Sequence, residues 1–89
     1  SDLVVMLAIV SSLRDKVIPS KWIAFGEVGL TGEVRPIYNS MERLSEAQKQ
    51  GFEVAIIPKG NTPKKPMKGM KVVPVGYLYQ AIQFLLENS

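Results

Sequence analysis

The first apolar stretch of the chain predicts a helix. Residues 3–10 are all apolar, and either Ser1 or Asp2 can cap the start of a helix that reaches about Lys16 before Pro19 prevents its continuation. Because the first half is apolar all round, we expect it to need cover from strands upstream of the chain or from a second subunit. The chain also begins at this apolar run without an initiator Met, which favours a fragment of a larger protein.

The next apolar positions predict a β-hairpin. Trp22–Val28 is a short run rich in strand-forming residues, residues 29–32 have the composition of a turn, and Glu33–Ile37 supplies the second strand. Pro36 lacks a backbone donor, so we expect the second strand to have a free side or to end near it.

The middle of the chain predicts a helix over Ser40–Gln50. Asn39 and Glu42 have the spacing of a capping box, and Gly51 stands where a left-handed C-cap is expected. Helical spacing predicts an inner face made of four residues: Met41, Leu44, Ala47 and Gln48.

The remaining pattern predicts a parallel arrangement. Residues 53–57 form a continuous apolar run typical of a strand buried on both faces, so strand 33–37, the helix and strand 53–57 are expected to form a βαβ unit. Residues 71–75 form a further strand. Gly76 opens a last helix, whose inner stripe has four members: Leu78, Ala81, Ile82 and Leu85.

Composition restricts the chemistry of this single predicted domain. The chain has 89 residues, no Cys and no His, which removes thiolate nucleophiles, Cys-based zinc sites and the commonest general base and metal ligand. The apolar run 3–10 is too short to span a bilayer and lacks the flanks of a secretory signal. These features are compatible with a cytoplasmic protein without a membrane partner.

The most distinctive feature is an acid-free lysine segment, which we define as residues 59–71 (KGNTPKKPMKGMK). The chain has a net charge of +3, and this segment has five lysines, so the remainder sums to about −2. Its glycines and prolines predict an exposed loop, and lysines on such a loop suit contact with DNA phosphates without base readout. The alternative is a solvated loop that keeps strand edges soluble. The candidate DNA-binding residues are Lys59, Lys64, Lys65, Lys68 and Lys71.

Other chemical motifs are absent or weak. The glycines of residues 26–34 (GEVGLTGEV) lack the third position of a dinucleotide fingerprint, and no P-loop occurs in the chain. Glu27 and Glu33 flank the predicted turn, where carboxylates usually serve the turn itself. A Ser–Lys dyad would need a desolvated lysine, and every lysine stands in a loop, at an element end or on a polar helix face.

Five stretches together resemble the C-terminal domain of the bacterial RadA (Sms) family. These are SDLVVMLAIVSSLRDK, FGEVGLTGEVRPI, NSMERLSEAQKQGF, AIIPKGN and PKK, which cover most of the chain. That domain is similar to the proteolytic domain of Lon proteases, so the resemblance implies a mixed α/β fold, specifically an α+β two-layer, ribosomal-protein-like fold lacking its N-terminal strands.

The resemblance also implies a function without catalysis in this domain. Met41 stands where Lon has its catalytic lysine, and the serine position would precede Ser1, so we expect a protease-like scaffold that is not a protease. For the intact protein the family implies a DNA repair and recombination ATPase that processes branched DNA, with ATP, Mg and Zn bound upstream of this chain. It further implies DNA contact, a ring-like homo-oligomer and a recombinase partner.

Three hypotheses therefore stand at this point. The first is a scaffold and DNA-contact domain, and the second is a pure oligomerisation module whose lysine segment stays solvated. The third, a Lon-type Ser–Lys peptidase domain, is disfavoured by Met41.

Overall fold

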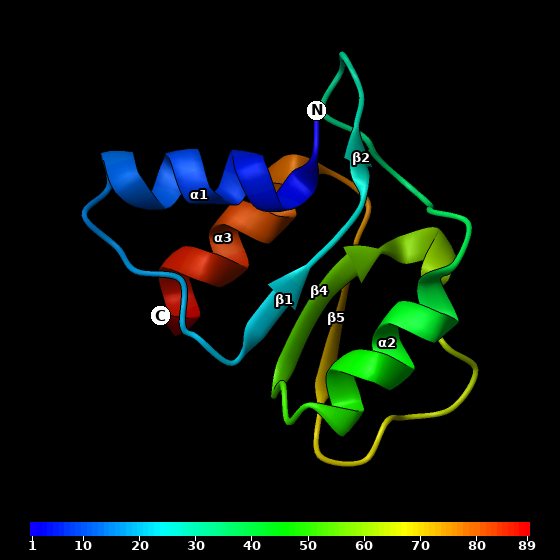
Figure 1. Ribbon diagram of the computed structural model, residues 1–89. Helices are drawn as coiled ribbons and strands as arrows, with labels where there is room; N and C mark the ends of the chain where they lie inside the picture. The colour runs from blue at the N-terminus through cyan, green and yellow to red at the C-terminus, as the bar shows by residue number, and fades with distance from the viewer.

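The protein is built around a small parallel sheet with helices on both sides (Figure 1). The computed structural model describes residues 1–89. In chain order the elements are α1 (Leu3–Leu13), β1 (Trp22–Ala24), β2 (Glu27–Val28), β3 (Val34–Arg35), α2 (Ser40–Lys49), β4 (Val54–Pro58), the 3-10 turn η1 (Lys59–Asn61), β5 (Lys71–Val75) and α3 (Leu78–Asn88). The predicted mixed α/β class is confirmed.

The strand β4 is the centre of the sheet. It pairs in parallel with β1 on one side and with β5 on the other, and β2 and β3 form a separate antiparallel hairpin. Its residues Ala55, Ile56 and Ile57 are at most 1% exposed, as expected for a strand covered on both faces. The predicted strand 53–57 is confirmed as β4, which begins and ends one residue later.

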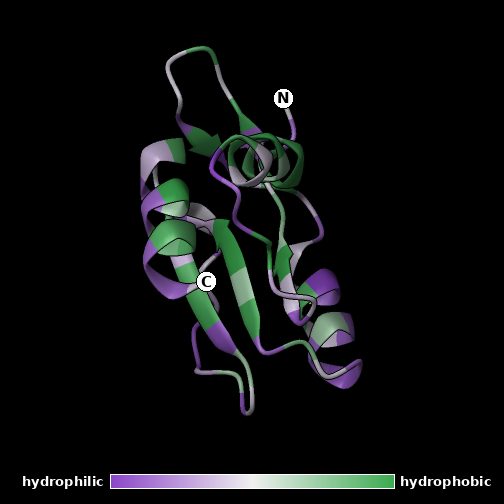
Figure 2. Cartoon of the chain, turned by 90° about the vertical axis from the view of Figure 1, so that its left-hand side faces the viewer, coloured by the Kyte–Doolittle hydropathy of each residue, from purple (hydrophilic) through white to green (hydrophobic).

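Alternate residues of β4 contribute to two hydrophobic cores. Ile56 belongs to a core shared with α1 and α3, whereas Ala55 and Ile57 belong to a core shared with α2. Figure 2 shows the green apolar colour along the sheet and on the helix sides turned toward it. Because both faces of β4 are apolar, the sheet carries helices on both faces, one more layer than the predicted two-layer arrangement.

The prediction of a single strand over Trp22–Val28 is wrong. Gly26 is buried with φ +139°, a conformation that side chains disfavour, and a Cβ there would meet Val34 Cγ1 at 2.9 Å. The chain therefore bends between β1 and β2. The first piece joins β4, and the second forms the hairpin with β3, which ends at Arg35 before Pro36.

The predicted βαβ unit is also corrected. The strand that pairs with β4 and precedes α2 is β1, not residues 33–37, whose strand β3 pairs with β2. Residues 76–78 occupy the outer side of the hairpin, where Val34 N–H donates to Gly76 O at 2.9 Å. Since the partner of a strand depends on contacts distant in sequence, local apolar patterning did not identify it.

The first helix is shorter than predicted and largely uncovered. It ends at Leu13 instead of Lys16, because Asp15 adopts a left-handed φ of 54° and Lys16 N–H donates to Ser11 O at 2.8 Å. The predicted cap is confirmed at Asp2, whose carboxylate accepts from Val4 N–H. One side is buried, and the opposite side, with Ile9 50% and Leu13 79% exposed, has nothing packed on it.

The ends of α2 follow the prediction only in part. Gly51 has φ +86°, and the amides of Gly51 and Phe52 donate to Gln48 O and Ala47 O, which confirms the left-handed C-cap. The capping box is wrong, because the Asn39 side chain makes no capping bond. Met41, predicted on the inner face, is 49% exposed, and the helix ends at Lys49.

The last helix agrees with the predicted inner stripe. Ala81 and Leu85 are fully buried, and Leu78 and Ile82 pack against the same core. The predicted strand 71–75 is confirmed as β5. Because β5 is an edge strand, the missing backbone N–H of Pro74 breaks no hydrogen bonds to a second neighbouring strand.

A carboxylate organises the β2–β3 turn. Glu33 accepts from Thr31 N–H and Oγ1 and from two nitrogens of Arg35, the closest Arg35 contact being 2.8 Å. These bonds, the Thr31 hydroxyl first and Arg35 second, lower the pKa of Glu33 from 4.5 to about 2. Glu33 thus has a structural role, as its position beside a turn predicted.

The lowered pKa of Glu33 predicts an acid-sensitive contribution to stability. The ionised form is favoured in the folded state, so the contribution is present above pH 4.5 and is lost as pH falls toward about 2. We expect Glu33→Gln to be less stable than the parent at neutral pH and to lose less stability across this window, as measured by urea unfolding at successive pH values. Thr31→Val, which keeps the carboxylate, should raise the pKa of Glu33; an unchanged carboxyl titration would contradict this assignment.

Candidate nucleic-acid interface

The lysine segment connects two adjacent parallel strands. Since β4 and β5 run in the same direction, the chain must return along the length of the sheet between Pro58 and Lys71, and such crossovers usually contain a helix. Here only the 3-10 turn η1 is regular, and the rest is an irregular loop that passes beside α2 (Figure 1). The predicted exposed loop is therefore confirmed for most of the segment.

Specific contacts hold the lysine segment in place. The Asn61 side chain accepts from Ile37 N–H at 2.8 Å and donates to Ile37 O at 3.1 Å, which joins η1 to the chain just before α2. Farther along, Gln48 Nε2 donates to Lys68 O at 2.8 Å. Met70 is buried in the core shared with α2, and Met67 packs against it. The segment is thus fixed at its start and near its end.

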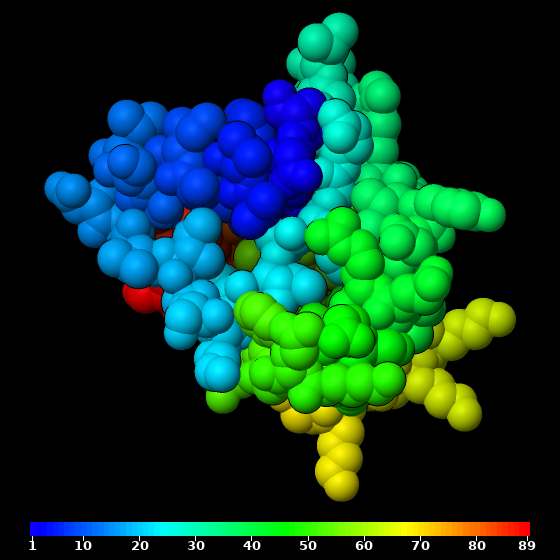
Figure 3. Space-filling view, viewed as in Figure 1, coloured from blue at the N-terminus to red at the C-terminus, as the bar shows by residue number.

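An open groove lies between the lysine segment and the start of α2. We call it the crossover groove; its volume is about 580 Å³, and it is bordered by Ser40, Met41 and residues 60–66. Figure 3 shows the yellow side chains of this part of the chain projecting from the right and lower edges of the molecule. The half-exposed Met41 lies on the rim of the groove.

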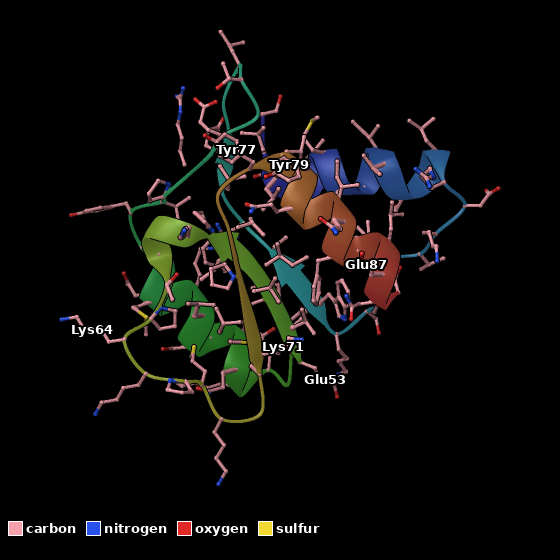
Figure 4. All side chains as sticks on the ribbon, turned by 180° about the vertical axis from the view of Figure 1, so that it is seen from behind. Glu53, Lys64, Lys71, Tyr77, Tyr79 and Glu87 are labelled. Atoms are coloured by element: carbon pink, nitrogen blue, oxygen red, sulfur yellow. The ribbon has the colours of Figure 1, made fainter.

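The structure brings together some of the predicted DNA-binding lysines and not others. Lys64 and Lys65 border the crossover groove, whereas Lys59 and Lys68 are exposed outside it. Lys71 lies on β5 with its Nζ 5.3 Å from the centroid of the Phe84 ring on α3. In Figure 4, Lys64 points away from the loop, and Lys71 lies well apart from Lys64.

None of the five lysines has an acidic partner within the protein. The two ion pairs of the structure are Ser1–Glu27 and Arg35–Glu33, both at the hairpin. The charge of the lysine segment is therefore uncompensated inside the fold and available to an external anion.

The start of α2 adds hydrogen-bond donors to the crossover groove. Among its first-turn amides Arg43 N–H donates to Asn39 O at 3.2 Å, whereas the N–H groups of residues 40–42 have no intrahelical acceptor. Ser40 is 9% exposed and its hydroxyl has no hydrogen-bond partner. No unpartnered side-chain oxygen or nitrogen is fully enclosed, so this hydroxyl is accessible to solvent, and Ser40 is one of the residues that line the groove.

Sequence reasoning did not identify three of these features. Ser40 and Asn61 gave no local signal, because a serine at a helix start and an asparagine in a loop are common as caps and turn residues. The exposed pair Tyr77 and Tyr79, with ring centroids 6.0 Å apart, was also not predicted. Figure 4 places this pair away from Lys64, so the tyrosines add no stacking surface to the crossover groove.

The structure contains no cluster of three or more side chains of the types His, Cys, Asp and Glu that could hold a metal ion. None of its helices is long and apolar enough to cross a membrane.

Comparison with known proteins identifies the family. A family model described as the subunit ChlI of Mg-chelatase matches residues 1–61 of the chain, more than half of it. The chain belongs to this family. The family is described by a subunit of Mg-chelatase, and the chelatase activity of that enzyme is not assigned to this chain.

The chain is also homologous to bacterial proteins named DNA repair protein RadA. It is 51% identical to the protein of Pseudomonas aeruginosa over 98% of the chain, 52% identical to that of Salmonella typhimurium over 92%, and 50% identical to that of Escherichia coli over 92%. It spans only 18–19% of the length of these relatives. The predicted resemblance to the RadA family is confirmed, and the narrower resemblance to the Lon proteolytic domain stays a prediction.

The Asn61 contacts predict a measurable contribution to stability. We expect Asn61→Ala to lower the free energy of unfolding by about 1–3 kcal/mol, because it leaves two partly buried backbone groups of Ile37 without partners. Asn39→Ala is the matched control, since that side chain makes no capping bond, and should change stability by less than about 0.5 kcal/mol. Equal losses in urea unfolding would contradict a specific role for Asn61.

Proposed function

We propose that this chain is a scaffold and DNA-contact domain of a RadA-like DNA repair and recombination protein that processes branched DNA. The homology to proteins named DNA repair protein RadA supports the repair role. The observation that supports DNA contact is a groove bordered by Lys64 and Lys65 with no acidic partner in reach. Binding would be electrostatic and indifferent to base sequence.

The proposal extends to the intact protein. An ATPase core using ATP and Mg, and a zinc motif, would lie in other domains, because this chain has no P-loop and no Cys. The domain would resemble the Lon proteolytic domain without cleaving peptides, since the thioether of Met41 cannot act as a base. Ser40 shares the groove with Lys64 and Lys65, but both lysines are exposed, whereas a lysine that activates serine must be desolvated.

Salt dependence tests the DNA contact. If Lys59, Lys64, Lys65 and Lys68 each meet a phosphate of duplex DNA, log affinity plotted against log salt should fall with a slope of about −3.6. Lys71 would add to this slope only by leaving the Phe84 ring. A single chain should bind weakly, with a dissociation constant on the order of 10⁻⁴ M at physiological salt, measured by fluorescence anisotropy.

Two double variants, each of which removes two positive charges, locate the contact. We expect Lys64→Gln with Lys65→Gln to weaken binding and to make the slope shallower by about 1.8, because two phosphate contacts are lost. Lys21→Gln with Lys49→Gln removes the same charge from exposed positions outside the segment and should leave the slope unchanged. Equal effects of the two double variants would mean that overall charge, not the lysine segment, attracts DNA.

A second candidate function is assembly without DNA contact. It is favoured by the uncovered side of α1, where Val5, Ile9 and Leu13 lie exposed along a shallow hollow of about 400 Å³. A ring-like homo-oligomer would bury this side, and a recombinase would be a further partner of the intact protein.

Sedimentation velocity tests the assembly. We expect a concentration-dependent oligomer that Ile9→Asp with Leu13→Asp abolishes, because two carboxylates would become buried at the contact. Leu30→Asp, at the exposed tip of the hairpin turn, is the matched control and should assemble as the parent does. An oligomer that forms and yet shows no DNA affinity at low salt would favour the pure assembly function.

A further inference from the structure

The crossover groove is bordered by residues that carry hydrogen-bond donors of three kinds and by no carboxylate. The N–H groups of residues 40–42 have no intrahelical or side-chain acceptor, the Ser40 hydroxyl has no partner within the protein, and Lys64 and Lys65 border the same space. The carboxylate nearest in sequence is Glu42 in the first turn, and it is exposed and not part of the groove lining. These amides, the hydroxyl and the two ammonium groups can all donate hydrogen bonds to an anion.

Two observations set this place apart from an ordinary helix start. Ser40 is nine-tenths buried as a residue, and its hydroxyl has no partner within the protein although it is not fully enclosed, so its hydrogen is available for donation. The lysine segment is also fixed beside α2, near the start of the helix by Asn61 and near its end by the bond from Gln48 to Lys68 O, so the backbone between these two points is held along the helix. The groove is therefore a pre-formed set of donors.

We propose that the crossover groove binds one phosphate group. Its oxygens would accept from the free amides of residues 40–42 and from the Ser40 hydroxyl, while Lys64 and Lys65 neutralise its charge. The proposal rests on the proposed DNA contact in that it identifies where a backbone phosphodiester sits. A free phosphate has the same chemistry, and the experiment separates the two sources.

The first experiment uses NMR of the ¹⁵N-labelled chain with inorganic phosphate and, separately, with a short oligonucleotide that lacks terminal phosphates. A chloride titration at equal ionic strength corrects for screening. We expect the largest amide shifts at residues 40–42 and at Lys64 and Lys65 with both ligands. Shifts spread evenly over all lysines, or absent from residues 40–42, would overturn the proposal.

The second experiment removes the hydroxyl. Ser40→Ala should weaken oligonucleotide binding about tenfold, because a hydrogen bond to a charged oxygen is lost. Ser45→Ala on the same helix lies outside the groove and should bind as the parent does. If both variants bind equally well, Ser40 does not contact the ligand and the phosphate site is wrong, while the lysine contact with DNA can still hold.

A third variant tests the groove without altering a buried residue. Met41→Glu places a carboxylate on the exposed rim and should lower affinity for phosphate and oligonucleotide at least tenfold by repulsion. Gln83→Glu, on exposed α3 surface, adds the same charge elsewhere and should reduce affinity less than threefold. Equal losses would contradict a local site.

The outcomes separate this inference from the proposed function. Phosphate that shifts residues 40–42 while the oligonucleotide does not bind would support the site and overturn the DNA contact. Oligonucleotide binding that depends on Lys64 and Lys65 but not on Ser40 or Met41 would support the DNA contact and overturn the phosphate site. If the Ser40, Met41 and lysine variants all weaken oligonucleotide binding, the phosphate site and the DNA contact are both supported.

Discussion

The parallel pairing of β4 with both of its neighbours is the constraint on which the rest of the structure depends. Parallel neighbours cannot be joined by a tight turn, so each connection has to travel back along the sheet. The first connection contains the hairpin and α2, which covers one face. The second contains no α-helix and becomes the lysine segment, laid beside α2 and fixed there by side chains. The path of this segment is thus a direct consequence of strand order, while its lysines are a property of the sequence.

The same constraint determines the electrostatics of the crossover groove. A helix usually satisfies its first amides with a capping side chain, but the Asn39 side chain does not cap α2. The lysine segment, which passes beside the start of the helix, contains no Asp or Glu. Ser40, in the first turn of α2, then borders the same hollow as Lys64 and Lys65. The charge of these lysines has no acidic partner within the protein, so an external anion can neutralise it.

Two unpartnered surfaces lie on different parts of the molecule. The uncovered side of α1 is apolar, while the crossover groove is basic, and Figure 3 shows the blue helix and the yellow lysine segment at opposite edges. Assembly through the first would therefore leave the second open. Several weak anion sites carried by one assembly bind a long polyanion with much greater avidity than a single site does, so the two functions considered for this chain are compatible.

The sequence by itself determined the local elements. The apolar run of β4, the inner stripe of α3, the Gly51 cap and the exposed lysines were all predicted, because each depends on residues a few positions apart. Only the tertiary structure decided that β1 and not β3 joins β4, since that choice depends on the bend at Gly26 and its contact with Val34. It also decided that Ser40 and Met41 border the same groove as Lys64 and Lys65, because these residues are brought together by a crossover whose path no local pattern predicts.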